Sequence, residues 1–154
     1  MARRDINNMN EQAKQVIEEV LDKGFIMNIA FHDFVGTWSC VVNYISDEDY
    51  NLYWISSPEV RHSKAIAENP QFAGTVTVSE EGEDNLGIQF SGIAEKIDTP
   101  PVEIVARYFT KRGKEAPGEG VDFLKGRSWY VLRPRHIDVI SQKLWGFKKE
   151  KVNL

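Results

Sequence analysis

The residues with the clearest chemical potential lie in one short stretch, where a predicted β-strand runs directly into a predicted helix. Ser57 is a typical N-cap residue and Pro58 suits the first helical position, so we expect the helix to begin there. Arg61 and Lys64 are three residues apart and would share one face of this helix. Because a helix N-terminus carries unpaired N–H groups and a positive dipole end, the stretch can bind a phosphate group. The alternative is an ordinary capped surface helix with solvated cations.

Other residues that commonly carry chemistry are scattered along the chain. The three histidines, His32, His62 and His136, show no metal-ligand spacing, so the sequence predicts no metal site. Cys40 lacks a matching His and Asp arrangement, and we expect a small buried residue rather than a nucleophile. No glycine-rich nucleotide loop, zinc-protease motif or nucleophile elbow is present. Phosphate binding near Arg61 is therefore the most specific hypothesis.

Length and composition indicate a single domain over residues 1–154. With one cysteine the chain forms no internal disulfide, and no signal-like segment opens it, so we expect a cytoplasmic protein. Its longest apolar stretches are far shorter than the about 20 residues that cross a bilayer, so no membrane association is expected. The net charge of −4 weighs against nucleic acid as a main partner.

Two further helices are expected to flank the strands. Asn8 and Glu11 resemble a capping box, and apolar residues recur at helical spacing over residues 13–21. Gly24 should end this helix in the left-handed conformation. The two prolines at residues 100–101 should open the other helix. Its expected inner face consists of Val102, Val105 and Phe109.

Strands account for most of the remaining chain. They are expected over residues 25–31, 37–45, 51–55, 72–79, 86–97, 128–132 and 137–140. Gly92, inside the longest of them, indicates a bulge that bends the sheet, and residues 133–136 are expected to form the turn between the last two strands. Six or seven antiparallel strands with few helices predict a mainly β fold, a closed or nearly closed barrel with flanking helices.

The stretch over residues 54–64 resembles the phosphate-binding segment of the pyridoxamine 5'-phosphate oxidase-like, FMN-binding split-barrel family. The resemblance extends to the opening helix and to residues 37–42, 89–95, 132–134 and 145–147, so its short motifs are spread over nearly the whole chain. It implies a six- to seven-stranded antiparallel split barrel that binds FMN. The positions that match the family's phosphate-binding cluster are Ser57, Arg61, His62, Ser63 and Lys64.

The resemblance also implies where the flavin ring would lie. Trp38, Ser39, Cys40 and Val41 match the strand along the isoalloxazine ring, whose backbone serves the polar edge of the ring. Gln89 would come from the partner subunit and Trp145 would cover the ring, in a homodimer that holds FMN at the subunit interface. A flat, amphipathic ring system needs an apolar wall, a few hydrogen bonds and a cationic phosphate anchor, and these residue types supply all three.

Two departures from the family pattern narrow the expected activity. His62 and Ser63 separate Arg61 from Lys64, where the oxidases proper have an adjacent Arg-Lys pair. The C-terminal Arg-x-His arrangement that binds pyridoxamine phosphate is also missing, so oxidation of that substrate is not expected. The sequence predicts an FMN-dependent oxidoreductase for an unidentified small substrate. The alternative is a non-catalytic module that binds flavin, haem or deazaflavin.

Overall fold

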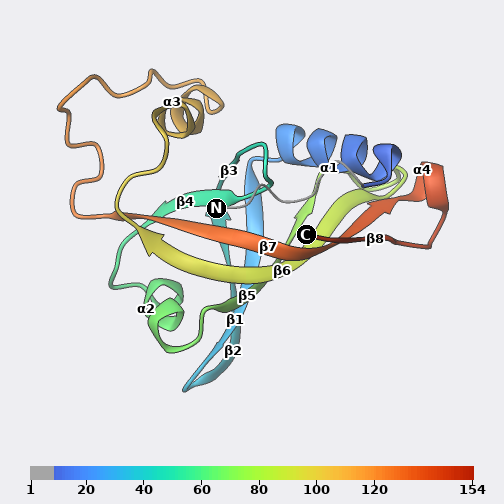
Figure 1. The fold of residues 1–154 in the computed structure, drawn as a ribbon, viewed down its shortest axis with the longest axis horizontal. Coiled ribbons are helices and arrows are strands. Elements are labelled where there is room, and N and C mark those ends of the chain that lie inside the picture. Colours follow the sequence, from blue (N-terminus) through green and yellow to red (C-terminus); the bar gives the residue numbers. More distant parts are fainter. Residues whose placement is uncertain (1–8) are drawn as a thin grey trace.

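A computed structural model describes residues 9–154, in which one antiparallel sheet of eight strands is flanked by four helices (Figure 1). The strands are β1 (Ile26–Asp33), β2 (Gly36–Asn43), β3 (Ile45–Ser46), β4 (Leu52–Ser56), β5 (Gln71–Thr77), β6 (Leu86–Ile97), β7 (Ser128–Ser141) and β8 (Glu150–Asn153). The helices are α1 (Glu11–Lys23), α2 (Arg61–Glu68), α3 (Val102–Thr110) and α4 (Gln142–Trp145).

The strand order is β2-β1-β5-β6-β7-β4-β3, and β8 pairs with β7 beside this path. β7 pairs with β6 along its length, with β4 through its first residues and with β8 nearer its end. The sheet curls into a half-barrel, so that β2 at one end contacts β4 near the other. This confirms the mainly β, barrel-like class with flanking helices, although β3 and β8 are too short to be recognised from the sequence.

The main hydrophobic core fills the curl of the sheet under α1. Five apolar residues of α1 at helical spacing are buried there, and Trp54 of β4 stacks on Tyr130 of β7 with ring centroids 5.7 Å apart. A second, smaller cluster lies under α3 and contains Trp129. Burial of one large apolar side chain stabilises the folded state by about 1.5–3 kcal/mol. The five buried residues of α1 therefore hold this helix against the sheet mainly through its apolar face.

The start and end of α1 differ from the sequence expectation. Asn10 is the N-cap, and its side-chain oxygen accepts hydrogen bonds from the backbone N–H groups of residues 12 and 13. Asn8 lies outside the described residues. The left-handed conformation predicted for Gly24 is wrong, since its φ is −73°. A Cβ there would lie 2.5 Å from the hydroxyl of Tyr44 and 2.6 Å from Val76, so glycine permits close packing instead.

The turn predicted at residues 133–136 is wrong, because β7 continues through it. Gly92 pairs with Pro134 and Ser91 pairs with His136, so Arg135 is an additional residue in the ladder. The register shift confirms the bulge predicted at Gly92, where a Cβ would overlap the carbonyl oxygen of Arg133. A bulge explains how Pro134, which cannot donate a ladder hydrogen bond, is accommodated in an interior strand.

The inner face of α3 is displaced from the predicted one. Val102 is 81% exposed, whereas Ile104 is buried, with Val105 and Tyr108 packed beside it. Pro101 is the N-cap, so Val102 is the first helical residue and points away from the sheet. Phe109 contacts the rings of Tyr108 and Phe123 at the edge of this cluster.

Candidate functional site

α2 begins later than the sequence predicts. The Ser57 hydroxyl accepts a hydrogen bond from the backbone N–H of Glu59 (3.2 Å), which holds residues 57–60 in a turn. Helical conformation starts at Arg61, with Val60 in extended conformation as the N-cap. The prediction that Ser57 caps a helix starting at Pro58 is therefore wrong. No side chain of the described part of the chain caps α2, so its first backbone N–H groups are open to another acceptor.

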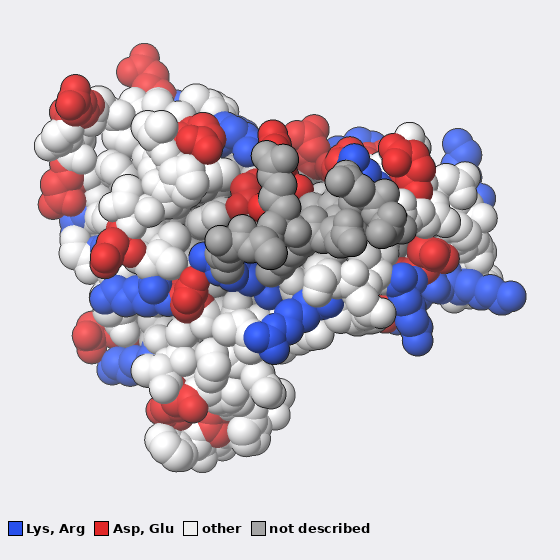
Figure 2. Space-filling view, in the orientation of Figure 1, with Lys and Arg blue, Asp and Glu red and all other residues white. Residues whose placement is uncertain are grey.

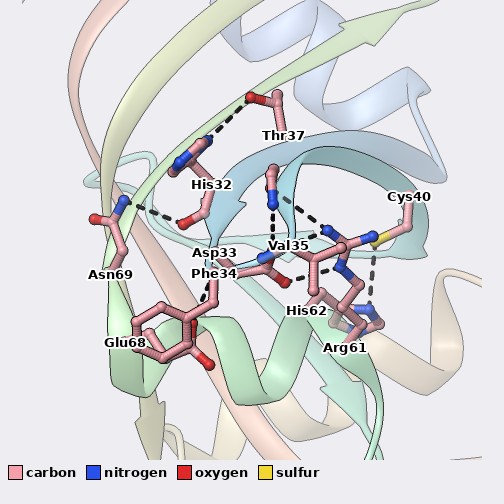
Figure 3. Close-up of polar contacts among 11 residues, drawn as sticks. His32, Asp33, Phe34, Val35, Thr37, Cys40, Arg61, His62, Glu68 and Asn69 are labelled. Atoms are coloured by element: carbon pink, nitrogen blue, oxygen red, sulfur yellow. Dashed lines mark hydrogen bonds and ion pairs between the residues drawn. The ribbon is translucent and has the colours of Figure 1, made fainter.

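Arg61 is held by the turn between β1 and β2 (Figure 3). Its Nε donates to Asp33 Oδ2 (2.8 Å) and its Nη2 donates to Asp33 Oδ1 (2.9 Å), while the guanidinium lies 4.8 Å from the ring centroid of Trp38. Asp33 also accepts hydrogen bonds from the backbone N–H groups of Val35 and Gly36. Arg61 and these two bonds hold the pKa of the Asp33 carboxyl well below its usual range, despite the opposing effect of burial. The ion pair therefore stays charged.

One edge of the Arg61 guanidinium remains open. Nη1 has no hydrogen-bond partner among the residues that the structure describes, and the side chain is 32% exposed. A guanidinium carries five N–H groups, so Nη1 can still donate two hydrogen bonds to an anion. Lys64 forms an exposed ion pair with Glu59 at 3.2 Å. Both cations thus have a carboxylate partner, and the charge of the cluster is closer to neutral than the sequence suggests.

The C-terminal end of α2 fixes the same hairpin turn. Glu68 accepts a hydrogen bond from the backbone N–H of Phe34 (3.2 Å), and the side chain of Asn69 donates to the carbonyl of His32 (3.3 Å) (Figure 3). Together with the Arg61–Asp33 pair, these bonds attach both ends of α2 to the β1–β2 hairpin. The hairpin and the helix start therefore keep a defined geometry relative to each other.

β2 forms an exposed wall next to this helix start. It is the terminal strand of the sheet path and pairs with β1 alone. Trp38 and Val41 are each 54% exposed, which is unusual for large apolar residues of a strand. A hollow of about 310 Å³ is lined by Trp38, Ser39, Thr37 and Ala30. The structure thus brings the predicted ring-binding strand and the predicted phosphate-binding helix together through Trp38 and Arg61.

The expectation that Cys40 has no histidine partner is wrong. Its Sγ lies 3.3 Å from Nδ1 of His62, and Nε2 of the same imidazole lies 2.8 Å from the hydroxyl of Ser56. Cys40 is partly exposed rather than fully buried. Burial raises the pKa of the Cys40 thiol and lowers the pKa of the His62 imidazole. Both groups are therefore uncharged near neutral pH.

The Ser63 hydroxyl is buried without a hydrogen-bond partner among the residues that the structure describes. It lies in the first turn of α2, two residues after Arg61, and a buried polar group without a partner costs about 1–3 kcal/mol. A ligand oxygen at the helix start would be one acceptor for this hydroxyl.

Within one chain, Gln89 and Trp145 contact residues outside α2. Gln89 of β6 accepts a hydrogen bond from Lys149 Nζ (2.6 Å), and Trp145 belongs to α4, where it packs against the main core. Figure 1 shows α4 and α2 at opposite ends of the molecule. Figure 2 shows Lys and Arg side chains gathered near the α4 end, while acidic and basic side chains are interspersed over the rest of that face. A single chain does not complete the predicted site.

A larger hollow, about 1050 Å³, lies elsewhere, between α1, the β3–β4 turn and α3. None of the predicted site residues lines it. Carboxylates outnumber cations in its lining, with Glu18, Glu19, Asp22, Asp47, Glu48 and Asp49 against Lys14, Arg107 and Lys111. Such a lining opposes an anionic cofactor, so size alone does not make this hollow the stronger candidate.

The sequence did not identify Asp33 and Ser56 as site residues. Asp33 precedes a turn glycine, which signals the turn but not the contact with Arg61, 28 residues away. Ser56 ends β4, and only the curl of the sheet brings His62 between it and Cys40.

Comparison with known proteins supports the fold but goes no further. Neither a scan against protein-family models nor a search of the curated proteins finds a match. Among solved structures, a conserved hypothetical protein from Mycobacterium tuberculosis is similar with a TM-score of 0.74 at 12% identity, over 100% of this chain and 98% of the other. The heme storage protein HutZ from Vibrio cholerae is similar with a TM-score of 0.65 at 16% identity, over 80% of this chain and 92% of the other. A putative pyridoxamine 5'-phosphate oxidase from Listeria innocua has a TM-score of 0.65 at 13% identity, over 82% of this chain and 96% of the other.

The chain has the split-barrel fold. At these identities the likeness extends to the fold alone, and the similar proteins include a heme storage protein as well as the putative oxidase. Within residues 9–154 of this split barrel, no helix is long and apolar enough to span a membrane. The same residues contain no group of three or more His, Cys, Asp or Glu side chains placed to hold a metal ion.

Proposed function

We propose that this split barrel binds FMN as a homodimer and works as an FMN-dependent oxidoreductase. The observation that carries the proposal is the junction of β2 with the start of α2, where Trp38 lies over the guanidinium of Arg61. The ring would lie along residues 38–41 and the phosphate at Arg61. Gln89 and Trp145 would come from the partner subunit, which fits their distance from α2 in the single chain.

The residues at the helix start fit a phosphate monoester. Within residues 9–154, the open Nη1 edge of Arg61, the uncapped first turn of α2 and the hydroxyl of Ser63 are donors without acceptors. Ser57 and the backbone N–H of His62 would complete the set, and Lys64 would add charge from the periphery. The carboxylate of Asp33 sets the orientation of Arg61. It binds the Nε and Nη2 side of the planar guanidinium, so the Nη1 side faces a fixed direction.

Bound FMN would supply the hydride or electron transfer, and the chain would position it. Trp38 and Val41 would shield the ring from water on β2, and backbone groups of Ser39 and Cys40 would bond its polar edge. No acid or base of the chain is required for this chemistry. Pyridoxamine phosphate itself is not the proposed substrate, because the C-terminal Arg-x-His arrangement is missing.

The first experiment compares FMN with riboflavin, which differ only in the phosphate. Contacts between a charged donor and a phosphate contribute about 1.5–3 kcal/mol, or roughly tenfold to more than a hundredfold in affinity. We expect the wild-type protein to bind FMN at least tenfold more tightly than riboflavin, and Arg61→Ala to reduce this ratio to near one. Flavin fluorescence titration gives both dissociation constants.

Riboflavin affinity provides the internal control, since a variant that merely unfolds would lose both ligands. Lys64→Ala is the matched control on the same helix, because its ion pair with Glu59 is exposed, and we expect a smaller change in the ratio. An unchanged ratio in Arg61→Ala, or no FMN binding by the wild type, would contradict the anchor. Reduction of bound FMN by NADH or NADPH, followed by reoxidation, then separates an oxidoreductase from a passive flavin carrier.

Haem is the second candidate, since the cations at the proposed anchor are already neutralised and solved split barrels include heme proteins. His32 of β1 is exposed, and its Nε2 has no hydrogen-bond partner among the described residues. That nitrogen would be the candidate to hold the haem iron. The absorbance spectrum of the protein distinguishes the two, because haem gives a Soret band and oxidised FMN gives paired bands in the blue and near ultraviolet. Loss of the Soret band in His32→Ala would support haem.

A further inference from the structure

Three polar side chains form a continuous chain across the seam between β2 and β4. The imidazole of His62, in the first turn of α2, contacts the Cys40 thiol of β2 through Nδ1 (3.3 Å) and the Ser56 hydroxyl of β4 through Nε2 (2.8 Å). Figure 3 shows the imidazole turned toward the sulfur. Both ring nitrogens are engaged, so the imidazole has none left for the proposed phosphate. These side chains form a separate cluster beside that site.

The geometry points to a nucleophile with its base: we propose that Cys40 exchanges with small disulfides, that His62 accepts its proton and that Ser56 positions the imidazole. In the tautomer that carries its proton on Nε2, the imidazole donates to Ser56 and its Nδ1 lone pair faces the S–H group. A base at this distance activates a thiol during attack. The pKa directions agree, because burial, the only cause of either shift, keeps the imidazole free to accept a proton.

Charges on the neighbouring elements leave this pair undisturbed. Arg61, which precedes His62 on α2, is bonded to Asp33 of β1, and Lys64 is bonded to Glu59. The thiol is therefore activated by proton transfer rather than by a resting thiolate next to a cation. This distinction predicts a particular pH dependence.

Cys40 is placed where a small molecule can reach it. It is partly exposed on the terminal strand of the sheet path, and Trp38 and Ser39 just before it line the 310 Å³ hollow. It is the sole cysteine of the chain, so the second sulfur must come from another molecule. A low-molecular-mass disulfide supplies that sulfur and the oxidising equivalents together.

The exchange balances without another reactant. The Cys40 sulfur attacks one sulfur of the disulfide RSSR as the S–H proton moves to Nδ1 of His62. The bond between Cys40 and one RS group forms while the bond within RSSR breaks. The departing RS⁻ takes the proton from the imidazole and leaves as RSH. Cys40 is oxidised to the mixed disulfide and RSSR is reduced, and a second thiol reverses the step.

The test uses 4,4'-dithiodipyridine, an uncharged disulfide whose released thiol absorbs light. We expect folded wild-type protein at pH 6 to react at least tenfold faster than the same chain in urea, where the thiol has an ordinary pKa of about 8.5. His62→Gln should lose that advantage, while His136→Gln, a matched histidine variant on β7, should keep it. Mass spectrometry should find one adduct, absent from Cys40→Ser.

The pH profile separates a base from a structural bridge. In the wild type the rate should persist down to the pKa of His62, which burial places below its ordinary value, and fall as the imidazole is protonated. In His62→Gln it should rise only with thiolate formation at alkaline pH. Ser56→Ala should slow the reaction at pH 6 without altering the adduct. The proposal would be overturned if the Cys40 thiol of the folded wild type reacted no faster than that of the unfolded chain. It would equally be overturned if the pH–rate profile of His62→Gln equalled that of the wild type. The protein is used free of flavin, because Cys40 belongs to the strand along which the ring is proposed to lie, so this result does not depend on the proposed FMN site.

Discussion

At the scale of single residues, the Asp33–Arg61 pair gives the sharpest prediction about stability. Asp33→Asn keeps the shape of the side chain but removes the charge that two guanidinium N–H groups contact. We therefore expect a lower midpoint of urea unfolding at pH 7. Glu59→Gln is the matched control, because its ion pair with Lys64 is exposed and should contribute little. Equal effects of the two substitutions would contradict the structural importance of Asp33.

The pH dependence of this effect has a definite sign. Folding lowers the pKa of Asp33, so the stability that it adds is complete above its unfolded pKa of about 3.9. As the pH falls below about 4 toward the folded-state pKa, the Asp33 carboxylate is protonated and that stability is progressively lost. Wild type and Asp33→Asn should thus differ most above about pH 5, and the difference should shrink steadily as the pH falls below about 4. Urea unfolding at a series of pH values measures the difference.

Residue types alone pointed to Arg61 and its neighbours, since a basic, hydroxyl-rich helix start has a local signature. They did not predict what holds Arg61. Asp33 reaches it across 28 residues through a hairpin turn, and no local pattern encodes a contact of that range. The same reason explains the wrong interpretation of Cys40, whose partner His62 arrives from the far side of the half-barrel seam.

At the scale of elements, the bulge where β6 meets β7 gives a second stability prediction. A Cβ at residue 92 would overlap the backbone of Arg133, which cannot move without breaking the β6–β7 ladder. We expect Gly92→Ala to cost about 1–3 kcal/mol of unfolding free energy, the usual range for overpacking. Gly118→Ala is the control, because its Cβ would meet Val121 at 3.7 Å, an ordinary contact, and should change stability by less than about 0.5 kcal/mol. Similar losses in both variants would contradict the clash.

Element boundaries show which signals are local. The strand over 86–97 and its bulge were predictable, because the residue pattern of a strand and a glycine inside it are signals that span only a few residues. The continuity of β7 was not, since Pro134 is a turn residue by propensity and is accommodated only because Gly92 lies opposite it. The start of α2 was misplaced for a similar reason, because the Ser57 hydroxyl bonds within a turn instead of capping the helix.

At the scale of the molecule, one chain leaves its candidate site incomplete. The sheet curls but its terminal strand β2 has one unpaired edge, and apolar side chains remain exposed along the β1–β2 hairpin. Gln89 contacts Lys149 and Trp145 belongs to α4, so in the proposed homodimer a second copy would bring them to α2. The sequence predicted the barrel class because many short strands are patterned independently. It could not show that the two halves of the predicted site lie apart in one chain.

The exposed edge makes the proposed homodimer testable. Val41 is 54% exposed on β2, so lysine there should leave the isolated chain folded while placing a charge in a proposed interface. We expect Val41→Lys to weaken dimerisation at least tenfold. Val121→Lys is the control, a 56% exposed valine in the loop before β7 that should leave the dimer intact. Light scattering after size exclusion reports the mass, and a wild-type monomer, or a Val41→Lys dimer as stable as the wild type, would show that β2 is not the contact.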